Sequence, residues 1–398
     1  METIKIILQQ MPQISKPQLK FMLKLFLLLM CLRGRANFRN LSRYSNYHEK
    51  TFSRWYYRNF NFVEFNRLLF KFIINHDKSS VMISAIDCSF IPKSGKHTEG
   101  LGKFYNGSQG KAEKGLEIFT IAVIDLEKNT GYHLSTRQTV AINNDEETRV
   151  DQYLAHLRQD RPALPEQVHY LTADGYYSKK KFIDGVVEMG LEQIGKLRHD
   201  AALRWLYNGE QKSRGRKRLY DGKVKLDDLN RCEFAGSQED GTKLYTAVVN
   251  SARFERNLKI VYLIKQLGNK VQTALLFSTD LKLKAQDLVR YYKARFQIEF
   301  MLRTAKQYLG LNDCQARGHE SLHFHFNAVM TTLNLLKLED QSQEGSEPNK
   351  VISIASWKVR KANEHLLERF SSYLGLDFSS IKSRPDFDDF CNYGAIAA

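Results

Sequence analysis

Three acidic residues stand where a folded chain could bring them together. Asp87 follows the apolar run 81–86, and Asp174 follows a second apolar run, 168–173. Both runs predict β-strands, so each aspartate is expected at the end of a strand. Glu299 lies in a segment that is expected to be helical. Carboxylate oxygens are the ligands that hard divalent cations prefer, so the three predict a metal site for chemistry on phosphates.

The helix that carries Glu299 is expected to place other polar side chains beside it. With about 100° of rotation per residue and Tyr292 at zero, Glu299 falls at about −20°. On the same scale Arg295, Arg303 and Lys306 fall at about −60°, +20° and −40°. One face with three cations, a tyrosine hydroxyl and a carboxylate suits a phosphodiester. The alternative is a solvated face stabilised by ion pairs of Glu299 with Arg295 and Arg303.

The expected cofactor follows from the chemistry. Phosphodiester cleavage needs an activated water or hydroxyl and a stabilised leaving oxygen, and two divalent cations roughly 3.5–4 Å apart supply both. Mg²⁺ keeps waters and substrate phosphates as ligands, so a few carboxylates suffice. We therefore expect Asp87, Asp174 and Glu299 to bind two Mg²⁺ ions, for which Mn²⁺ could stand in. Asp125, which also ends an apolar strand, and Asp151, on the next helix, are the competing acids.

The chain is strongly basic, with 60 Lys and Arg against 44 Asp and Glu and a net charge of +16. Each cation set against a phosphate releases a counterion, so this charge favours a polyanionic partner. By itself it does not distinguish DNA, RNA and an acidic membrane. Residues 1–80 hold 14 Lys and Arg against 4 Asp and Glu, which is +10 of the +16. A compact basic N-terminal module is therefore expected.

Membrane insertion and disulfide bonds are not expected. The most apolar stretch, 25–32, is far shorter than the ~20 residues that a spanning helix needs. We expect it to be a buried helix face. The five cysteines are odd in number and far apart, without zinc spacing. Their usage indicates a reducing cytoplasm.

The N-terminal segment, 1–78, is expected to be a helical DNA-binding domain. Residues 40–55 resemble a helix-turn-helix, with the first helix ending near Tyr44 and the second at 49–58. Lys50, Arg54 and Arg58 recur every four residues and so share one face, which could meet a phosphate backbone or groove. The alternative is a solvated basic face on a small helical bundle.

Residues 79–338 are expected to form a mixed α/β catalytic domain. Strands are predicted at 81–87, 115–125, 131–140 and 168–173, with helices at 146–158 and 178–189. Three strands, a helix, a strand and a helix is the order of a ribonuclease-H-like sheet. A β-rich insertion at about 196–280 is expected to form its own small sheet or to extend the core one.

The insertion contains an exposed basic loop at 211–218, in which Arg214, Arg216 and Lys217 are candidate DNA contacts. One long helix is predicted at 283–309, because no Gly or Pro interrupts it before its end, and another follows at 319–337. Residues 339–350 are expected to be a linker. Residues 351–398 are expected to be a helical segment, 352–373, with a loosely held tail from Asp377 onward.

Three motifs resemble those of a known family. Tyr292-x₂-Arg295-x₃-Glu299-x₆-Lys306 matches the Y-R-E-K signature of a class of bacterial DDE insertion-sequence transposases. The blocks around that family's first and second aspartates resemble Ile86-Asp87-Cys88-Ser89 and Asp174-Gly175-Tyr176-Tyr177-Ser178-x₃-Phe182. The resemblance spans about residues 81–310. The long separation of Asp174 and Glu299 suits members with a β-rich insertion before the glutamate.

The resemblance implies a cut-and-paste transposase of the bacterial cytoplasm, associated with the nucleoid. Such enzymes act as homodimers on double-stranded DNA, cleave the paired terminal inverted repeats and join the 3′-hydroxyl ends to target DNA, in several cases through a hairpin. Tyr292, Arg295 and Lys306 would contact terminal phosphates. In hairpin-forming relatives an aromatic residue of the insertion stacks near a flipped base, and Trp205 is the candidate by region; the alternative is a core or lid residue.

Two other functions stay open at this point. A metal-dependent nuclease on the same fold would hydrolyse DNA without joining it. A DNA-binding regulator would bind without catalysis, although the three acids argue against a decayed copy.

Overall fold

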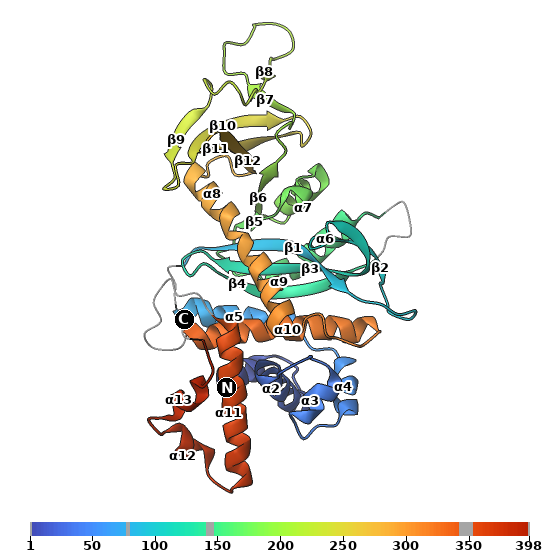
Figure 1. The fold of residues 1–398 in the computed structure, drawn as a ribbon. Coiled ribbons are helices and arrows are strands. Elements are labelled where there is room, and N and C mark those ends of the chain that lie inside the picture. Colours follow the sequence, from blue (N-terminus) through green and yellow to red (C-terminus); the bar gives the residue numbers. More distant parts are fainter. Residues whose placement is uncertain (1, 77–79, 141–146, 342–352, 397–398) are drawn as a thin grey trace.

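The computed structural model of the chain describes residues 2–76, 80–140, 147–341 and 353–396 (Figure 1). One mixed sheet of twelve strands connects a core, at the middle of the view, to an insertion above it. Helices of both chain ends lie below the core. This is the mixed α/β architecture with helical flanks that the sequence predicts.

The core half of the sheet has the order β4–β3–β1–β5–β6. The strands are β1 (Met82–Pro92), β3 (Lys111–Asp125), β4 (Thr130–Thr139), β5 (Tyr170–Thr172) and β6 (Glu192–Leu197). Strands β1, β3 and β4 are antiparallel, while β5 and β6 run parallel to β1. A short strand, β2 (Gly102–Asn106), pairs with the start of β3. Three antiparallel strands followed by two parallel ones is the ribonuclease-H-like arrangement.

Strand β1 is longer than the sequence predicts, so the expectation that Asp87 ends it is wrong. The strand continues to Pro92, and Asp87 pairs with Thr120 of β3. On its other edge, however, β1 pairs with β5 only at Ser84 and Ala85. Beyond Ala85 that edge is open because β5 stops at Thr172. Asp87 therefore lies where the parallel pairing ends, although it lies in the middle of its own strand.

Strand β4 closes the core edge against helix α10 (His319–Gln341) through side-chain amides. A bulge interrupts its pairing with β3 between Ile121 and Ala122 and leaves backbone groups without strand partners. The amide of Asn334 accepts from the His133 N–H at 2.8 Å and donates to its carbonyl at 2.7 Å. Asn327, two turns earlier, makes the same pair of bonds to Thr136. The two asparagine side chains thus take the place of a partner strand, because they bond the buried N–H and C=O groups of β4.

Most residues of helix α10 are buried, and one of them is a lysine, Lys337. Lys337 is 8% exposed and donates to the carbonyl of Gly131. Burial lowers the pKa of Lys337 from 10.5 to about 7. The folded chain therefore holds fewer protons than the unfolded chain between about pH 7 and pH 10.5, and unfolding becomes harder as the pH rises through that window.

This burial predicts a pH-dependent stability that one substitution removes. The free energy of unfolding of the wild type is expected to rise from pH 6 to pH 9. Lys337→Met is expected to show a smaller rise, because it lacks the contribution of the Lys337 ammonium. Denaturant unfolding of both proteins at both pH values measures it. The exposed Lys270 provides the matched control in Lys270→Met. Parallel pH profiles for wild type and Lys337→Met would contradict the assignment.

Helices α6 (Arg149–Asp160) and α7 (Lys180–Glu188) pack together on one side of the core sheet, and α5 (Phe62–His76), α9 (Phe296–Tyr308) and α10 pack on the other. Two single 3₁₀ turns, Arg161–Ala163 and Gly175–Tyr177, follow α6 and β5. The predicted helices at 146–158 and 178–189 correspond to α6 and α7. Residues 141–146 are outside the described residues.

The insertion extends the core sheet rather than forming a separate one. Strand β12 pairs antiparallel with β6, and β11, β10, β7 and β8 follow in order, with β9 beside β10. Their bounds are β7 (Leu203–Leu206), β8 (Tyr220–Lys223), β9 (Glu233–Ser237), β10 (Lys243–Ser251), β11 (Arg256–Leu267) and β12 (Lys270–Ser278). The alternation of buried residues along β11 and β12 forms two small apolar clusters, one on each face.

The single helix predicted at 283–309 is wrong, since the structure has two. Helix α8 (Ala285–Ala294) packs on β6, β11 and β12, and α9 packs on β1, β3 and β4. The break is at Arg295, where the chain tightens through an N–H···O bond from Arg295 to Tyr292 of 3.3 Å. Neither Gly nor Pro causes this break. Helices α8 and α9 pack on two parts of a twisted sheet, and one straight helix could not pack on both parts.

The N-terminal helices are α1 (Glu2–Gln10), α2 (Lys16–Cys31), α3 (Phe38–Arg43), α4 (Glu49–Tyr56) and α5. The apolar stretch 25–32 is buried within and just after α2, as predicted. Its residues share one continuous apolar cluster with α5, the core sheet and α10. Within the described part of the chain, no helix combines the length and apolar character needed to cross a membrane.

The C-terminal segment is more ordered than the sequence predicts. Helix α11 (Ile354–Tyr373) packs against α2, and α12 (Phe378–Lys382) and α13 (Phe387–Asn392) fold back on α11. Asn363 of α11 donates to the carbonyls of Cys391 and Tyr393, and Arg360 pairs with Asp388 at 2.7 Å. The tail is therefore not loosely held. The predicted linker begins within α10, which continues to Gln341, and 342–350 lie outside the described residues.

Candidate active site

Asp87 lies on β1, and Asp174 lies just past the end of the neighbouring strand β5. The parallel register of β1 and β5 sets Ser84 beside Leu171 and Ala85 beside Thr172. Two residues further along, this register brings Asp174 next to Asp87, just past the end of β5. Asp174 also caps the turn that follows, because its Oδ1 accepts from the Tyr176 N–H at 2.9 Å. The sheet thus brings these two predicted ligands together, and both are half-buried.

The electrostatics of Asp87 reflect crowded carboxylates. Burial, together with the negative charges of Asp174 and Glu299, raises the pKa of Asp87 to about 7, while Arg295 opposes this shift. The Cys88 N–H also stabilises the charge by donating to Asp87 Oδ1 at 2.8 Å. Both other predicted ligands therefore act on Asp87 through space.

Glu299 approaches this pair from α9, but an arginine holds it. Arg295 donates to Glu299 Oε1 at 2.8 Å, and the two side chains are 7% and 35% exposed. Burial lowers the pKa of Arg295, but Glu299, Tyr292 and Asp87 outweigh it, so the net shift is upward. The predicted ion pair of Glu299 with Arg295 is present.

The other polar residues that were predicted to share a helix face with Glu299 do not all lie near the carboxylates. Lys306 reaches across to β1 and donates to the carbonyl of Phe90 at 2.7 Å. Tyr292 is half-buried beside Arg295, whose guanidinium lies 5.7 Å from the centre of its ring. Arg303 is exposed and packs on Phe300. Tyr292, Arg295 and Lys306 thus surround the carboxylates, whereas Arg303 faces solvent.

The donor set suits a hard divalent cation. It consists of carboxylate oxygens, and the pKa of Asp87 is raised by burial and then by the negative charge of Asp174, a charge that a cation would neutralise. In the described residues, no three His, Cys, Asp or Glu side chains are gathered closely enough to hold a metal ion. Glu299 is instead paired with Arg295. Asp87 and Asp174 are the two predicted ligands that the sheet brings together.

The competing acids have structural partners instead. Asp125 is fully buried, bonds to Ser80 and accepts from the backbone N–H groups of Glu127 and Lys128. Asp151 forms a capping box with Thr148 at the start of α6 and pairs with Lys181. Both acids therefore secure turns and helix ends away from the carboxylate pair.

The predicted helix-turn-helix corresponds to α3 and α4, with α3 capped at Tyr44 and α4 ending two residues earlier than expected. Lys50, Arg54 and Arg58 are all exposed, and the guanidinium of Arg58 lies 4.3 Å from the centre of the Trp55 ring. Lys50 and Arg54 lie on α4, whereas Arg58 lies just beyond its end, so the helix face predicted for all three carries two of them.

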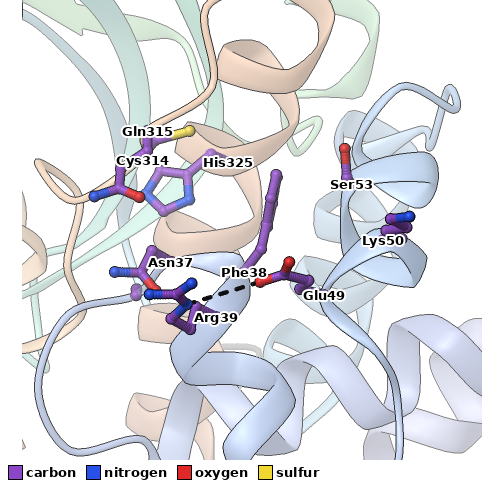
Figure 2. A pocket seen from close by; sticks show the side chains of 10 residues that line it. Asn37, Phe38, Arg39, Glu49, Lys50, Ser53, Cys314, Gln315 and His325 are labelled. Carbon is purple, nitrogen blue, oxygen red and sulfur yellow. Dashed lines mark ion pairs between the residues drawn. The ribbon is translucent and has the colours of Figure 1, made fainter.

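A hollow of about 560 Å³ lies between these N-terminal helices and the start of α10 with the loop before it (Figure 2). Helices α3 and α4 supply Arg39, Glu49 and Lys50 to it, the loop supplies Gln315, and α10 supplies the buried His325. The Arg39–Glu49 pair, at 4.0 Å, bridges α3 and α4. Lys50 therefore faces a space that the two parts of the molecule share.

The candidate contacts of the insertion lie apart from the carboxylates. Trp205 on β7 is 8% exposed within the apolar cluster of the insertion, and the guanidinium of Arg231 lies 4.6 Å from the centre of its ring. This placement is that of a core residue. Arg214, Arg216 and Lys217 are exposed on the loop between β7 and β8, at the top of Figure 1.

One feature of the site was missed from the sequence. A cavity of about 510 Å³ adjoins Asp87, Asp174 and Lys306 and is lined by Tyr105, Tyr153, Tyr176 and Tyr177. Tyr176 and Tyr177 follow directly on Asp174, which is the signal that could have indicated them. Tyr105 and Tyr153 come from the β2–β3 hairpin and α6, which no spacing rule connects with the aspartates.

The chain was compared with known families and proteins. The family model described as Transposase DDE domain matches residues 82–335, which is nearly two thirds of the chain and contains all three carboxylates. No match was found among curated proteins.

Proposed function

Since the chain belongs to the family of DDE transposases, we propose that it is a cut-and-paste transposase whose catalytic carboxylates are Asp87, Asp174 and Glu299. It would bind the terminal inverted repeats of an insertion sequence as a homodimer, cleave them and join the freed 3′-hydroxyls to target DNA. The observation that carries the proposal is the adjacency of Asp87 and Asp174 at the end of β5, with Glu299 close enough to act on Asp87.

The proposed chemistry is two transfers at phosphorus. In the first, the oxygen of water bonds to phosphorus, the bond to the 3′ oxygen of the element end breaks, and that oxygen takes up a proton. In the second, the freed 3′-hydroxyl loses its proton and its oxygen bonds to a target phosphorus, while the bond from that phosphorus to a target 3′ oxygen breaks and this oxygen takes up a proton. Asp87, Asp174 and Glu299 would hold two Mg²⁺ or Mn²⁺ ions, which when bound activate the attacking oxygen and stabilise the leaving one.

The chain's own cations would position the DNA. Lys306 and Arg295 are bonded to Phe90 and Glu299 in the absence of DNA. A terminal phosphate would offer Lys306 a charged acceptor in place of a neutral carbonyl, and it would offer Arg295 a second anion that competes with Glu299. When Arg295 turns to phosphate it frees Glu299. End binding would thereby complete the carboxylate set, so that cutting depends on a bound end.

The N-terminal domain, residues 1–78, would provide affinity for the element ends. The triple variant Lys50→Ala, Arg54→Ala and Arg58→Ala is expected to bind an end duplex more weakly. Its plot of log affinity against log salt concentration is expected to be shallower by about three, because about 0.9 counterion is released per phosphate contact.

Fluorescence anisotropy across a salt series measures both quantities. The matched control removes three exposed cations of the C-terminal segment, Arg369, Lys382 and Arg384. Equal salt slopes for the two triple variants would place the DNA contacts elsewhere on the molecule.

The proposal as a whole is tested by incubating purified protein with Mg²⁺, a linear donor carrying the cognate ends and a target plasmid. Excision with joined products is expected. Cuts without joining would favour a nuclease on this fold, and binding without cutting would favour a regulator. Hairpin-ended excision products would reveal that intermediate on a denaturing gel.

A further inference from the structure

Two lysines face each other across the β2–β3 hairpin without a counter-charge. In the antiparallel register Lys103 of β2 lies directly opposite Lys114 of β3. Side chains in this position have Cβ atoms about 5 Å apart, and like charges at that separation destabilise a sheet. Both lysines are exposed, and among the residues that the structure describes neither ammonium has an ion-pair partner. The hairpin therefore keeps two positive charges together at a cost in stability.

The two faces of this hairpin differ in charge. Phe104 is buried on one face, and on that same face Glu113 pairs with Lys111 at 3.4 Å. Because side chains alternate along a strand, Lys103 and Lys114 share the opposite face, which is open to solvent. The acid of the hairpin is thus on one face and the unpaired lysines are on the other.

The hairpin borders the carboxylates but is held by a helix on the side of the sheet opposite to α9. Its end, residues 105–108, lines the same cavity as the two aspartates. Arg149 of α6 fixes the hairpin in place, because its guanidinium lies 4.9 Å from the centre of the Phe104 ring and donates to the Lys103 carbonyl at 3.4 Å. The cations proposed for the element end lie on α9 or next to it. The carboxylates therefore have two separate groups of cations nearby.

The distance of the lysine pair from Asp87 suits a duplex. Gly115, next to Lys114, pairs with Pro92, which is five residues beyond Asp87 on β1. At about 3.3 Å per residue, the lysine pair is roughly 17 Å from Asp87 along the strand. A duplex advances about 3.4 Å per base pair, so about five base pairs cover that distance. A small anion could not touch both places at once, whereas a duplex presents phosphates along its whole length.

We propose that the face of the β2–β3 hairpin with Lys103 and Lys114 holds the backbone of target DNA during joining, an inference that rests on the proposed function. Joining brings two polyanions to one set of carboxylates, so each needs its own cations. The element end has the cations around α9, and it stops at the reacting 3′-hydroxyl. Target DNA continues as a duplex on both sides of the attacked phosphate, so it also reaches the hairpin. Its phosphates offset the repulsion within the lysine pair.

The test separates joining from cutting. The double variant Lys103→Gln, Lys114→Gln is incubated with Mg²⁺, a pre-cut end duplex that carries a 3′-hydroxyl, and increasing concentrations of target plasmid. The target concentration for half-maximal joining is expected to rise about tenfold, because two lost phosphate contacts cost about an order of magnitude in affinity at near-physiological salt. The maximal joining rate is expected to stay, since neither lysine touches the reacting atoms. The plot of log target affinity against log salt concentration is expected to be shallower by about two.

Two further variants make the result specific. Lys103→Arg, Lys114→Arg keeps both charges and is expected to join like wild type. Lys111→Gln, Lys270→Gln removes one exposed lysine from the opposite face of the hairpin and one from β12, and it is the matched control for lost net charge. Removing a repulsive pair is not expected to lower the melting temperature. A double glutamine variant of Lys103 and Lys114 that melts earlier than wild type would indicate a structural role and contradict the proposal.

The outcomes that overturn the proposal differ from those that overturn the proposed function. An unchanged half-maximal target concentration in the double glutamine variant, or an equal rise in the matched control, would reject this surface alone if wild type cuts and joins. Slower cutting of an uncut donor by the double glutamine variant would assign the lysines to element DNA and would also reject it. A wild type that neither cuts nor joins would overturn both proposals.

Discussion

Replacing Asp87 with asparagine is expected to lower the rate of strand cleavage by about a thousandfold or more while leaving DNA binding intact. The substitution removes a carboxylate from the centre of the proposed site, where charge stabilisation accounts for most of the catalysis. It does not remove the bond from the Cys88 N–H, which the asparagine oxygen can accept in the same way.

Stability separates this catalytic role from a structural one. Burial and Asp174 raise the pKa of Asp87 above that of an unfolded aspartate, so its charge opposes folding at neutral and alkaline pH. Asp87→Asn is therefore expected to melt at the same temperature as wild type or higher. Asp151→Asn, at a competing acid that caps α6, should keep near-normal cleavage. Lost cleavage together with a lower melting temperature in Asp87→Asn would contradict this account.

Glu299→Gln is expected to lower the rate of strand cleavage about as much as Asp87→Asn does. Unlike Asp87→Asn, it is also expected to destabilise the fold. It leaves the guanidinium of Arg295 buried without its 2.8 Å charged partner. Breaking a fully buried pair costs about 3–5 kcal/mol, and the 35% exposure of Glu299 reduces this to about 1–2 kcal/mol. Denaturant unfolding and a cleavage time course on the same preparation measure both effects.

The control for Glu299 is the exposed pair Arg290–Glu127, at 2.9 Å on the neighbouring helix. Glu127→Gln should cost less than about 1 kcal/mol, because both side chains of this pair are about half exposed. A Glu299→Gln protein as stable as wild type would mean that Arg295 has another partner. A Glu299→Gln protein that cuts DNA at the wild-type rate would remove Glu299 from the proposed site.

Several parts of the fold could be predicted because local patterns determine them. The end of α3 and the start of α4 were predicted from the resemblance of residues 40–55 to a helix-turn-helix with its turn at 45–46, while α4 ends two residues earlier than predicted. The order of strands around Asp87 and Asp174 was predicted because each apolar run is bounded by polar residues. The helical periodicity placed Arg295 beside Glu299, which the 2.8 Å contact confirms.

Other parts depend on packing that no local pattern encodes. The break at Arg295 has no Gly or Pro and follows from two halves of a helix packing on different strands. The extension of β1 past Asp87 depends on its partner β3, which is longer than its apolar run. The order of the C-terminal tail depends on Asn363 of α11, whose partners are almost thirty residues away.

The site was predictable only where local sequence patterns mark its residues. The carboxylates follow recognisable strands and motifs, so they could be named. The tyrosine-lined cavity joins Tyr105, Glu117, Tyr153 and Tyr176, four residues from a hairpin, a strand, a helix and a turn. Their proximity is a property of the whole sheet and could not be predicted from spacing.

The central claim is that Asp87, Asp174 and Glu299 together bind the divalent ions of a transposase. Anomalous diffraction from crystals of the protein with an end duplex and Mn²⁺ tests it most directly. The account predicts anomalous peaks within coordination distance of all three carboxylates, with Arg295 turned toward phosphate. No peak beside Asp87 and Asp174, or a peak that excludes Glu299 while Arg295 still holds it, would contradict the account.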